Sequence, residues 1–254
     1  MRPMSDREFD ELLVVIPAFN EARTIFDVVR SAKDLGYQVL VVDDCSSDIT
    51  ASRASEAGAE VLSLPINLGV GGALRAGFRF AIARGFTCVV QVDGDGQHPV
   101  HEIGALVQFA KSADAHLVIG SRYLSTSTSL QLSRTRRCVM RVFGLIASRI
   151  AGYKLTDTTS GFRVIHEPLL SEFARTFPTD YLGDTFQSTI SAIRSGYKVL
   201  EAPASLADRK FGKSSAGTFY AASRILKVTL LVLWRLSPPL RRFSDVRGPQ
   251  RNLG

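Results

Sequence analysis

Short apolar runs alternate with segments of helical spacing along residues 12–119, and this order constrains the fold more than any other feature of the sequence. The runs have the length of buried strands. They lie at Leu12–Ile16, Val39–Val42, Ala59–Leu64, Cys88–Val92 and Leu117–Ile119. Between them apolar residues recur at helical spacing, as in Ile25, Val28, Val29, Ala32 and Leu35 before a capping Gly36. This alternation predicts an α/β fold with a mostly parallel central sheet and helices on both faces.

Polar residues follow three of these predicted strands at the point where each strand ends. The pairs are Asn20/Glu21, Asp43/Asp44 and Asp93/Asp95. In α/β sheets ligands bind beyond the carboxyl ends of the strands. The convergence of three such ends favours a binding site over a set of unrelated turns.

The segment Asp93-Gly94-Asp95-Gly96-Gln97 closes the apolar run Cys88–Val92. Two lone carboxylates at this position are too costly to bury in a core. With the Gln97 amide they offer the hard oxygen ligands that Mg²⁺ or Mn²⁺ prefer, and such ions complete their shell with substrate phosphates. The alternative is a solvated Asp-Gly turn, which an isolated motif of this kind would favour.

The glycine-rich segment 69–77 fits neither of the common phosphate-binding motifs. Its glycines do not follow the dinucleotide spacing, and Phe78-Arg79 stands where a P-loop needs Lys and Ser or Thr. We therefore predict that these glycines allow tight packing between the loop and the helix that follows, which carries Leu74, Phe78, Ala81 and Ile82 on one face.

The net charge of +7 indicates an anionic partner. Residues 115–156 contain no acidic residue, and a helix at about 131–151 places an apolar stripe opposite a basic face. The stripe is Val139, Val142, Phe143, Ile146 and Ile150, and the basic face is Arg134, Arg137 and Arg141. Such a helix can lie in a membrane interface, or it can pack on the sheet with its basic face in water. Both interpretations stay open.

The predicted organisation is a catalytic domain at 1–216 followed by an apolar helix and basic tail at 217–254. The polar start Met1–Glu11 predicts no signal peptide, and the longest apolar run, Val228–Trp234, is far below the ~20 residues that span a bilayer. The scattered cysteines Cys45, Cys88 and Cys138 indicate a reducing compartment. These features predict a cytoplasmic protein, peripheral on the cytoplasmic face of the membrane.

Seven motifs in order identify a family resemblance that spans residues 14–214. They are Val15-Ile16-Pro17-Ala18-Phe19-Asn20-Glu21, Val41-Val42-Asp43-Asp44, Asn67-Leu68-Gly69, Asp93-Gly94-Asp95-Gly96-Gln97-His98-Pro99, Gly120-Ser121-Arg122, Ser160-Gly161-Phe162-Arg163 and Arg209-Lys210-Phe211-Gly212-Lys213-Ser214. The chain resembles the inverting family 2 glycosyltransferases with the GT-A fold. Within them it looks like the dolichyl- and polyprenyl-phosphate sugar synthases.

The resemblance implies a role for each matching residue. The residues expected to bind the nucleotide-sugar are Pro17, Phe19, Glu21, Val42, Asp44, Asp93, Gly94 and Asp95. The residues expected to bind the metal are Asp93, Asp95 and Gln97. The residues expected to bind the acceptor phosphate are Arg122, Arg209 and Ser214. The expected catalytic residues are Asp95, Arg122, Arg209 and Asp184. The chain departs from many relatives in two ways: Ser215 replaces a lysine after Ser214, and C-terminal transmembrane helices are absent.

The implied activity is metal-dependent transfer of a sugar, with inversion, from a UDP- or GDP-linked donor to a polyprenyl phosphate. The expected partners are this donor, the lipid phosphate, the membrane surface and a small membrane-anchoring protein, with no nucleic acid. A lipid phosphate is largely ionised near neutral pH, since its second pKa is ~6. It therefore needs placement by arginines more than deprotonation.

Three alternatives remain beside this activity. Transfer to a saccharide or small-molecule hydroxyl would need a general base, for which Asp184 and Asp157 are the candidates. A nucleotidyltransferase would use a similar nucleotide site. A non-enzymatic membrane or nucleic-acid binding module would leave Asp93 and Asp95 without a role. His98 and His101 adjoin the metal motif, and we interpret His98-Pro99 as shaping the turn.

Overall fold

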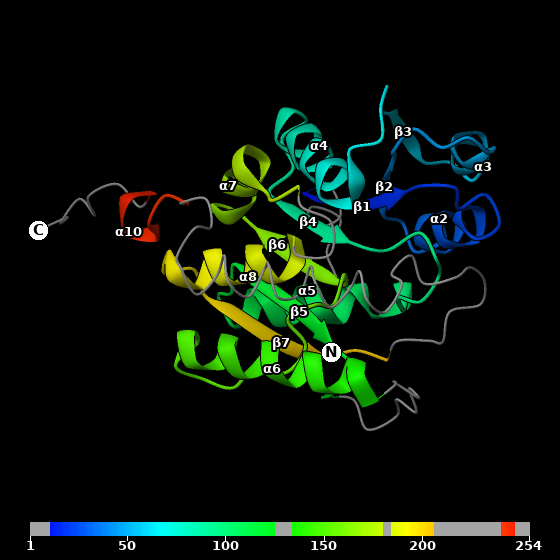
Figure 1. Cartoon of the computed structure of the whole chain (residues 1–254). Helices are drawn as coiled ribbons and strands as arrows, with labels where there is room; N and C mark the ends of the chain where they lie inside the picture. Colours follow the sequence, from blue (N-terminus) through cyan, green and yellow to red (C-terminus); the bar gives the residue numbers. More distant parts are fainter. Residues whose placement is uncertain (1–10, 125–133, 180–183, 206–239, 247–254) are drawn as a thin grey trace, which may run out of the picture.

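The computed structural model describes residues 11–124, 134–179, 184–205 and 240–246 of the chain (Figure 1). Seven strands form one twisted sheet in the order β3-β2-β1-β4-β6-β5-β7. The strands are β1 (Leu12–Ala18), β2 (Gln38–Asp43), β3 (Glu60–Ser63), β4 (Cys88–Gln91), β5 (Leu117–Ser121), β6 (Arg163–His166) and β7 (Val199–Pro203). The alternation of apolar runs and helical segments predicted this α/β fold, and the prediction is confirmed.

One strand runs against the others. β6 pairs antiparallel with both β4 and β5, whereas all other neighbours pair in parallel. Arg163, the first residue of β6, therefore lies in register with Gln91 near the end of β4 and with Ile119 near the end of β5. The reversal brings the loop before β6 to the sheet edge where the parallel strands end.

Helices cover both faces of the sheet. They are α2 (Ile25–Asp34), α3 (Thr50–Glu56), α4 (Gly69–Ala83), the 3₁₀ turn η1 (Val100–Glu102), α5 (Ile103–Ser112), α6 (Arg134–Ala151), α7 (Leu169–Thr176), α8 (Asp184–Arg194) and α10 (Phe243–Val246). Successive residues of a strand point to opposite faces, so β1 supplies Leu12, Val14 and Ile16 to one core and Leu13 and Val15 to the other.

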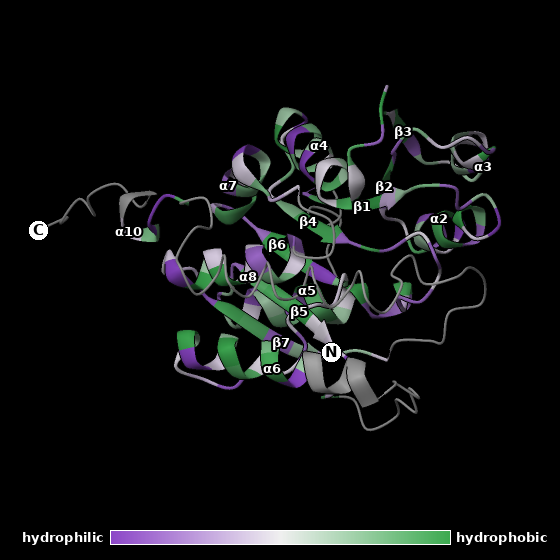
Figure 2. Cartoon of the chain, in the orientation of Figure 1, coloured by the Kyte–Doolittle hydropathy of each residue, from purple (hydrophilic) through white to green (hydrophobic). Residues whose placement is uncertain are grey.

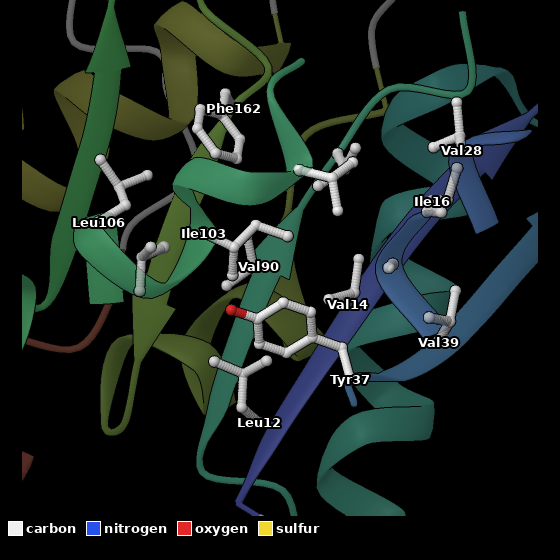
Figure 3. Packing of buried hydrophobic residues seen from close by; sticks show 14 of the residues in the cluster. Leu12, Val14, Ile16, Val28, Tyr37, Val39, Val90, Ile103, Leu106 and Phe162 are labelled. Atoms are coloured by element: carbon white, nitrogen blue, oxygen red, sulfur yellow. The ribbon is translucent and has the colours of Figure 1, made fainter. Parts of the chain in front are cut away.

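The first core lies between the sheet and α2, α3 and α5. Figure 3 shows Val14 and Val90 from the strands beside Ile103 and Leu106 from α5, with Tyr37 below them. The second core packs α4 and α7 on the opposite face, and Figure 2 shows the hydrophobic colour of the central strands β4 and β6, which contribute to both cores. Such double burial is typical of parallel strands covered by helices.

The predicted role of the glycines in α4 is confirmed. A Cβ at Gly77 would lie 2.5 Å from Val15 Cγ1, and one at Gly71 would lie 2.2 Å from the backbone oxygen of Pro178. The helix can approach the sheet this closely only where it carries no side chain. The predicted face of α2 is confirmed for Ile25, Val28, Val29 and Ala32, whereas Leu35 is 45% exposed because it follows the helix as its C-cap.

The predicted stripe on α6 is only partly correct. Phe143 is buried in a third cluster, where its ring stacks on Phe186 of α8 at 4.2 Å between centroids. Val142, expected in the same stripe, is 46% exposed because α8 contacts the side of the helix that carries Phe143 and Ala147. In the part of the chain described here, no helix is both long and apolar enough to cross a membrane. The predicted division after residue 216 falls in a range, 206–239, outside the described residues.

Candidate active site at the carboxyl edge of the sheet

The loops after β1, β2 and β4 are joined by hydrogen bonds at one edge of the sheet. Thr24 Oγ1 donates to the backbone oxygen of Gly94 over 2.7 Å. The N–H of Asn20 donates to Ser46 Oγ, and Asn20 Oδ1 accepts from the N–H of Ser47, both over 2.9 Å. The predicted convergence of the three polar strand ends is confirmed, although Asn20 is used to join two loops.

The residues predicted to bind the nucleotide lie around this edge. Phe19 is 48% exposed, and Pro17 and Glu21 are partly exposed. Val42 is fully buried, and its Cγ2 lies against Gly77, so only its backbone could meet a ligand. Its side chain supports the second core beneath the site.

Asp44 is a buried carboxylate that orients the loop after β3. Its Oδ1 accepts the N–H of Leu68 over 2.7 Å. Burial raises the pKa of Asp44 above its usual value, against the hydrogen bonds from the Leu68 and Gly69 N–H groups, which lower it. The carboxylate therefore links the strand end of β2 to the first turn of α4, beside the predicted base and ribose pocket.

Asp93 and Asp95 occupy different environments within one loop. The Asp93 side chain is 39% exposed, whereas Asp95 is 6% exposed and its Oδ1 accepts the N–H of Gln97 over 3.0 Å. Gly161, from the loop before β6, lies against the Asp93 carboxylate, and a Cβ there would be 2.7 Å from both oxygens. The glycine makes room for this carboxylate at the edge of the sheet.

The donor set of this loop fits a hard divalent cation. Asp93 and Asp95 supply carboxylate oxygens and Gln97 an amide oxygen, the ligand types that Mg²⁺ and Mn²⁺ prefer. Across the described ranges, no three His, Cys, Asp or Glu side chains gather into a metal-binding group. An ion held by this loop would take its remaining ligands from a bound diphosphate.

Arg122 follows β5 and is held by Asp157. Its Nε and Nη2 donate to the two Asp157 oxygens over 2.7 and 2.8 Å, and its backbone N–H donates to Oδ2 over 3.1 Å. The Asp157 carboxylate is the main reason that the pKa of Arg122 is raised despite burial, and Asp93 adds to this effect. Both Asp157 oxygens accept from Arg122, which shows a structural role for Asp157, and its candidacy as a general base stays a prediction.

Arg163 is a site residue that we did not assign a role from the sequence. It is fully buried, and it donates from Nε to the Ser160 oxygen and from Nη2 to the Thr158 oxygen, each over 2.7 Å. Burial lowers its pKa to about 10, while the charges of Asp184, Asp157 and Asp93 oppose this change. A charged residue at the start of the apolar run Val164-Ile165 was the available signal.

Asp184, at the start of α8, lies close enough to this arginine for their charges to interact. It is buried, and its Oδ2 has no hydrogen-bond partner among the described residues. Burial raises its pKa to about 6, against the N–H of Thr185 and the charge of Arg163, which lower it. A carboxyl group that titrates near neutral pH is suited to accept a proton.

The site therefore joins an acidic loop to two arginines that interact with carboxylates. The loop after β4 supplies Asp93 and Asp95, the end of β5 supplies Arg122 beside Asp157, and β6 supplies Arg163 near Asp184. Such an arrangement can bind a metal-bound diphosphate and a second anion together. Two residues predicted to bind the acceptor phosphate, Arg209 and Ser214, lie outside the described residues.

Comparisons with known proteins show which family has a sequence similar to the residues of this site. The profile of the family described as Glycosyl transferase family 2 matches residues 13–173, which include every described site residue except Asp184. The chain is 30% identical over 230 residues to the undecaprenyl-phosphate mannosyltransferase of Micrococcus luteus, with 86% of this chain and 92% of the relative covered. It is also 30% identical over 222 residues to the polyprenol monophosphomannose synthase of Mycolicibacterium smegmatis, with 84% and 83% covered.

A similar fold is found in glucosyl-3-phosphoglycerate synthase from Mycobacterium tuberculosis. Its crystal structure with Mn²⁺, UDP-glucose and phosphoglyceric acid superposes with a TM-score of 0.68 at 22% identity, and the match covers 94% of this chain and 86% of that one. The structure in complex with UDP alone has a TM-score of 0.67 at 22% identity, covering 94% and 87%. At this level of identity the likeness concerns the fold.

Proposed function

The chain belongs to glycosyl transferase family 2 and is a glycosyltransferase with a GT-A fold, and from this we propose that it moves one sugar from a nucleotide-diphosphate sugar to a polyprenyl phosphate. The donor is a UDP- or GDP-linked sugar, and the cofactor is Mg²⁺ or Mn²⁺. The acceptor is supported by two relatives that match over four-fifths or more of this chain, one named an undecaprenyl-phosphate mannosyltransferase and the other a polyprenol monophosphomannose synthase.

One observation carries the choice of a phosphate acceptor. Arg122 sits at the end of β5 with its Nε and Nη2 bound by Asp157, in the electrostatic field of Asp93. A planar guanidinium fixed on one edge presents its other edge in a defined direction, which suits bidentate contact with a phosphate. The acceptor phosphate would thus lie beside the diphosphate of the donor.

The chemistry of the step follows from this placement. The residues of the carboxyl edge hold the nucleotide, and Asp93, Asp95 and Gln97 would hold the metal. When bound, the metal ion stabilises the charge that develops on the departing diphosphate oxygen. An oxygen of the lipid phosphate forms a bond to the anomeric carbon as the bond to the diphosphate breaks, and one displacement of this kind inverts the configuration.

No general base is required for this acceptor. A phosphate monoester carries a nucleophilic oxygen at neutral pH, since its second pKa is ~6. Arg122 orients it and replaces part of its hydration, and proximity supplies much of the remaining rate enhancement. The family resemblance also assigns acceptor-phosphate binding to Arg209 and Ser214, which lie outside the described residues.

A membrane surface is the natural place for this reaction because the acceptor is a lipid. On α6, Val142 is 46% and Leu145 is 63% exposed, and Arg141 and Arg149 are exposed nearby. An apolar and basic surface of this kind suits the boundary of an anionic membrane. We place the enzyme at the cytoplasmic face, with a separate small membrane protein as a further anchor.

A second candidate is transfer to a hydroxyl group, which the Asp184 side chain favours. Its Oδ2 has no hydrogen-bond partner in the described ranges, and together with a pKa of about 6 this suits a general base. Such a base is needed for a hydroxyl acceptor and not for a phosphate. The Asp184→Asn variant therefore separates the two candidates.

The test measures sugar transfer with purified chain, Mn²⁺ and a panel of nucleotide-sugars. Undecaprenyl phosphate in vesicles is compared with a panel of saccharide and small-molecule hydroxyl acceptors. We expect transfer to the lipid phosphate, its loss in Asp95→Asn, and full activity in the control Asp114→Asn, an exposed aspartate outside the site. We expect Asp184→Asn to retain transfer to the lipid. Turnover with hydroxyl acceptors alone, reduced about 10²- to 10⁴-fold in Asp184→Asn, would instead establish the second candidate.

A further inference from the structure

We propose that Glu201 of β7 is a positioning residue for the acceptor-phosphate site, because it fixes the loop that holds Arg122. The inference rests on the proposed function of Arg122 as the phosphate-binding arginine. Glu201 lies in register with Ile119 of β5, three residues before Arg122, so β7 places its carboxylate beside the end of β5.

The Glu201 carboxylate is bound by the middle of the loop between α6 and β6. Its Oε1 accepts the N–H of Thr156 over 2.7 Å and the N–H of Asp157 over 2.6 Å. Its Oε2 accepts the Thr156 N–H over 2.8 Å and the Thr156 hydroxyl over 2.7 Å. Two consecutive backbone N–H groups and one hydroxyl therefore converge on a single side chain.

The next link runs from this loop to the arginine. Asp157, whose N–H Glu201 accepts, binds Arg122 through both carboxylate oxygens and also accepts the Arg122 backbone N–H. Thr156 Oγ1 lies 2.9 Å from Ser121 Oγ, directly before Arg122. The chain of contacts from Glu201 to the guanidinium has no step longer than a hydrogen bond.

A carboxylate at this position is electrostatically unfavourable, which argues that its acceptor capacity is needed. Burial raises the pKa of Glu201, and the charge of Asp157 raises it further against the hydrogen bonds of the loop. A glutamine would avoid the second negative charge, but its NH2 group would replace one of the two oxygens, and the Thr156 N–H, which contacts both oxygens, would then meet a donor. Only a carboxylate offers acceptors alone to all of these groups.

By holding Asp157, Glu201 also determines which edge of the Arg122 guanidinium is available to a phosphate. Asp157 engages the edge formed by Nε and Nη2, so a phosphate would meet the edge formed by Nη1 and Nη2. If the loop shifts, Asp157 shifts with it and this edge turns away from the acceptor. A displacement of ~1 Å is enough to lower reaction efficiency by about 10²-fold.

The Glu201→Gln variant tests the inference, with Glu60→Gln as the matched control. Glu60 is a strand glutamate that pairs with Arg84 over 2.7 Å and lies on β3, at the opposite edge of the sheet from β7. We expect Glu201→Gln to raise KM for undecaprenyl phosphate about 10- to 100-fold. KM for the nucleotide-sugar stays within about twofold, and Glu60→Gln changes neither constant.

The Arg122→Lys background shows whether Glu201 acts through the arginine. Lysine cannot form the two-point contact with Asp157, so adding Glu201→Gln there should change KM for the lipid by less than about threefold. Effects that multiply in the double variant, or a loss of kcat with both KM values unchanged, would overturn the proposal.

Two further measurements keep the test decisive if Glu201→Gln folds poorly or if the lipid is not the acceptor. Thr156→Val removes one hydroxyl and leaves the backbone contacts, and we expect a smaller rise in KM for the lipid. The NMR signal of the Arg122 Nε–H is assigned by its loss in Arg122→Lys. In Thr156→Val or Glu201→Gln this proton should exchange with water at least about tenfold faster, because its hydrogen bond to Asp157 is weakened. Unchanged exchange in a folded variant would refute the role of Glu201, whereas absence of lipid transfer by the unaltered chain would refute the proposed function alone.

Discussion

The imidazole of His98 accepts a hydrogen bond at Nδ1 from the backbone N–H of Asp93 over 2.9 Å, and its Nε2 lies 3.5 Å from Oδ2 of the same residue. When Nδ1 accepts, the neutral ring carries its proton on Nε2, which faces the carboxylate. His98 thus closes the loop that begins at Asp93 and orients the Asp93 side chain. The turn that we predicted from His98-Pro99 is held by this contact.

Replacing His98 with Phe should lower sugar transfer while preserving most of the packing. The new ring can keep the stack on Phe162, whose centroid lies 5.4 Å from that of His98, but it offers no acceptor to the Asp93 N–H. Residues that orient metal ligands typically affect activity or metal affinity about 10- to 100-fold. We expect a loss of that size in kcat/KM, together with a higher Mn²⁺ requirement. The control is His101→Phe at an exposed position, and equal activities in the two variants would contradict the prediction.

Gly161→Ala should reduce activity with little loss of stability. The new Cβ would lie 2.7 Å from both oxygens of Asp93, the mobile end of a partly exposed side chain that can turn away. We expect the apparent affinity for Mn²⁺ and the rate of transfer to fall by about 10²-fold. Urea unfolding and Mn²⁺ titration of the same preparation measure the two effects.

Gly71→Ala is the matched glycine variant and should show the opposite pattern. Its Cβ would lie 2.2 Å from the backbone oxygen of Pro178, which cannot move as a side chain does. We expect a loss of about 1–3 kcal/mol in the free energy of unfolding, as for other overpacked sites. A stable Gly71→Ala protein, or an unstable Gly161→Ala protein, would contradict the predicted difference between a backbone contact and a side-chain contact.

Asp184 should make stability fall as pH rises through a defined window. Its folded pKa is raised from 3.8 to about 6, mainly by burial, so the folded chain binds this proton more tightly than the unfolded chain does. The resulting stabilisation is complete below pH 3.8 and is lost as pH approaches about 6. Relative to Asp184→Asn, the unaltered protein should lose up to roughly 3 kcal/mol of unfolding free energy across this window, since one pKa unit corresponds to ~1.4 kcal/mol. Urea unfolding of both proteins at several pH values measures their unfolding free energies. The prediction is contradicted if the unaltered protein gains stability relative to Asp184→Asn as pH rises.

The double variant Val142→Ser with Leu145→Ser should weaken binding to anionic vesicles. Both side chains are exposed on α6, and burial of each in a lipid boundary contributes about 1 kcal/mol or more. We expect at least about tenfold weaker binding in a vesicle sedimentation assay, with unchanged activity toward a short-chain acceptor in solution. Leu35→Ser, at a leucine that is 45% exposed after α2, is the control. Equal vesicle binding by all three proteins would exclude α6 as the membrane contact.

The sequence by itself determined the strand and helix order and the acidic residues at the strand ends. Apolar runs report burial locally, because a short stretch without charge can be stable only inside the sheet. Asp93 and Asp95 could be placed at a ligand-binding edge because lone carboxylates cannot continue such a strand into the core. The close packing at the α4 glycines could likewise be predicted, because the spacing of these glycines matches no phosphate-binding motif.

Only the tertiary structure decided how the site is completed. β6 enters the sheet in reverse between β4 and β5, and this pairing joins segments that lie more than 40 residues apart in the chain. It brings Gly161 to Asp93, buries Arg163 among three carboxylates and lets Asp157 hold Arg122. Strand direction and partner are set by the summed burial and hydrogen bonding of the whole sheet, and no local pattern of residues encodes that sum.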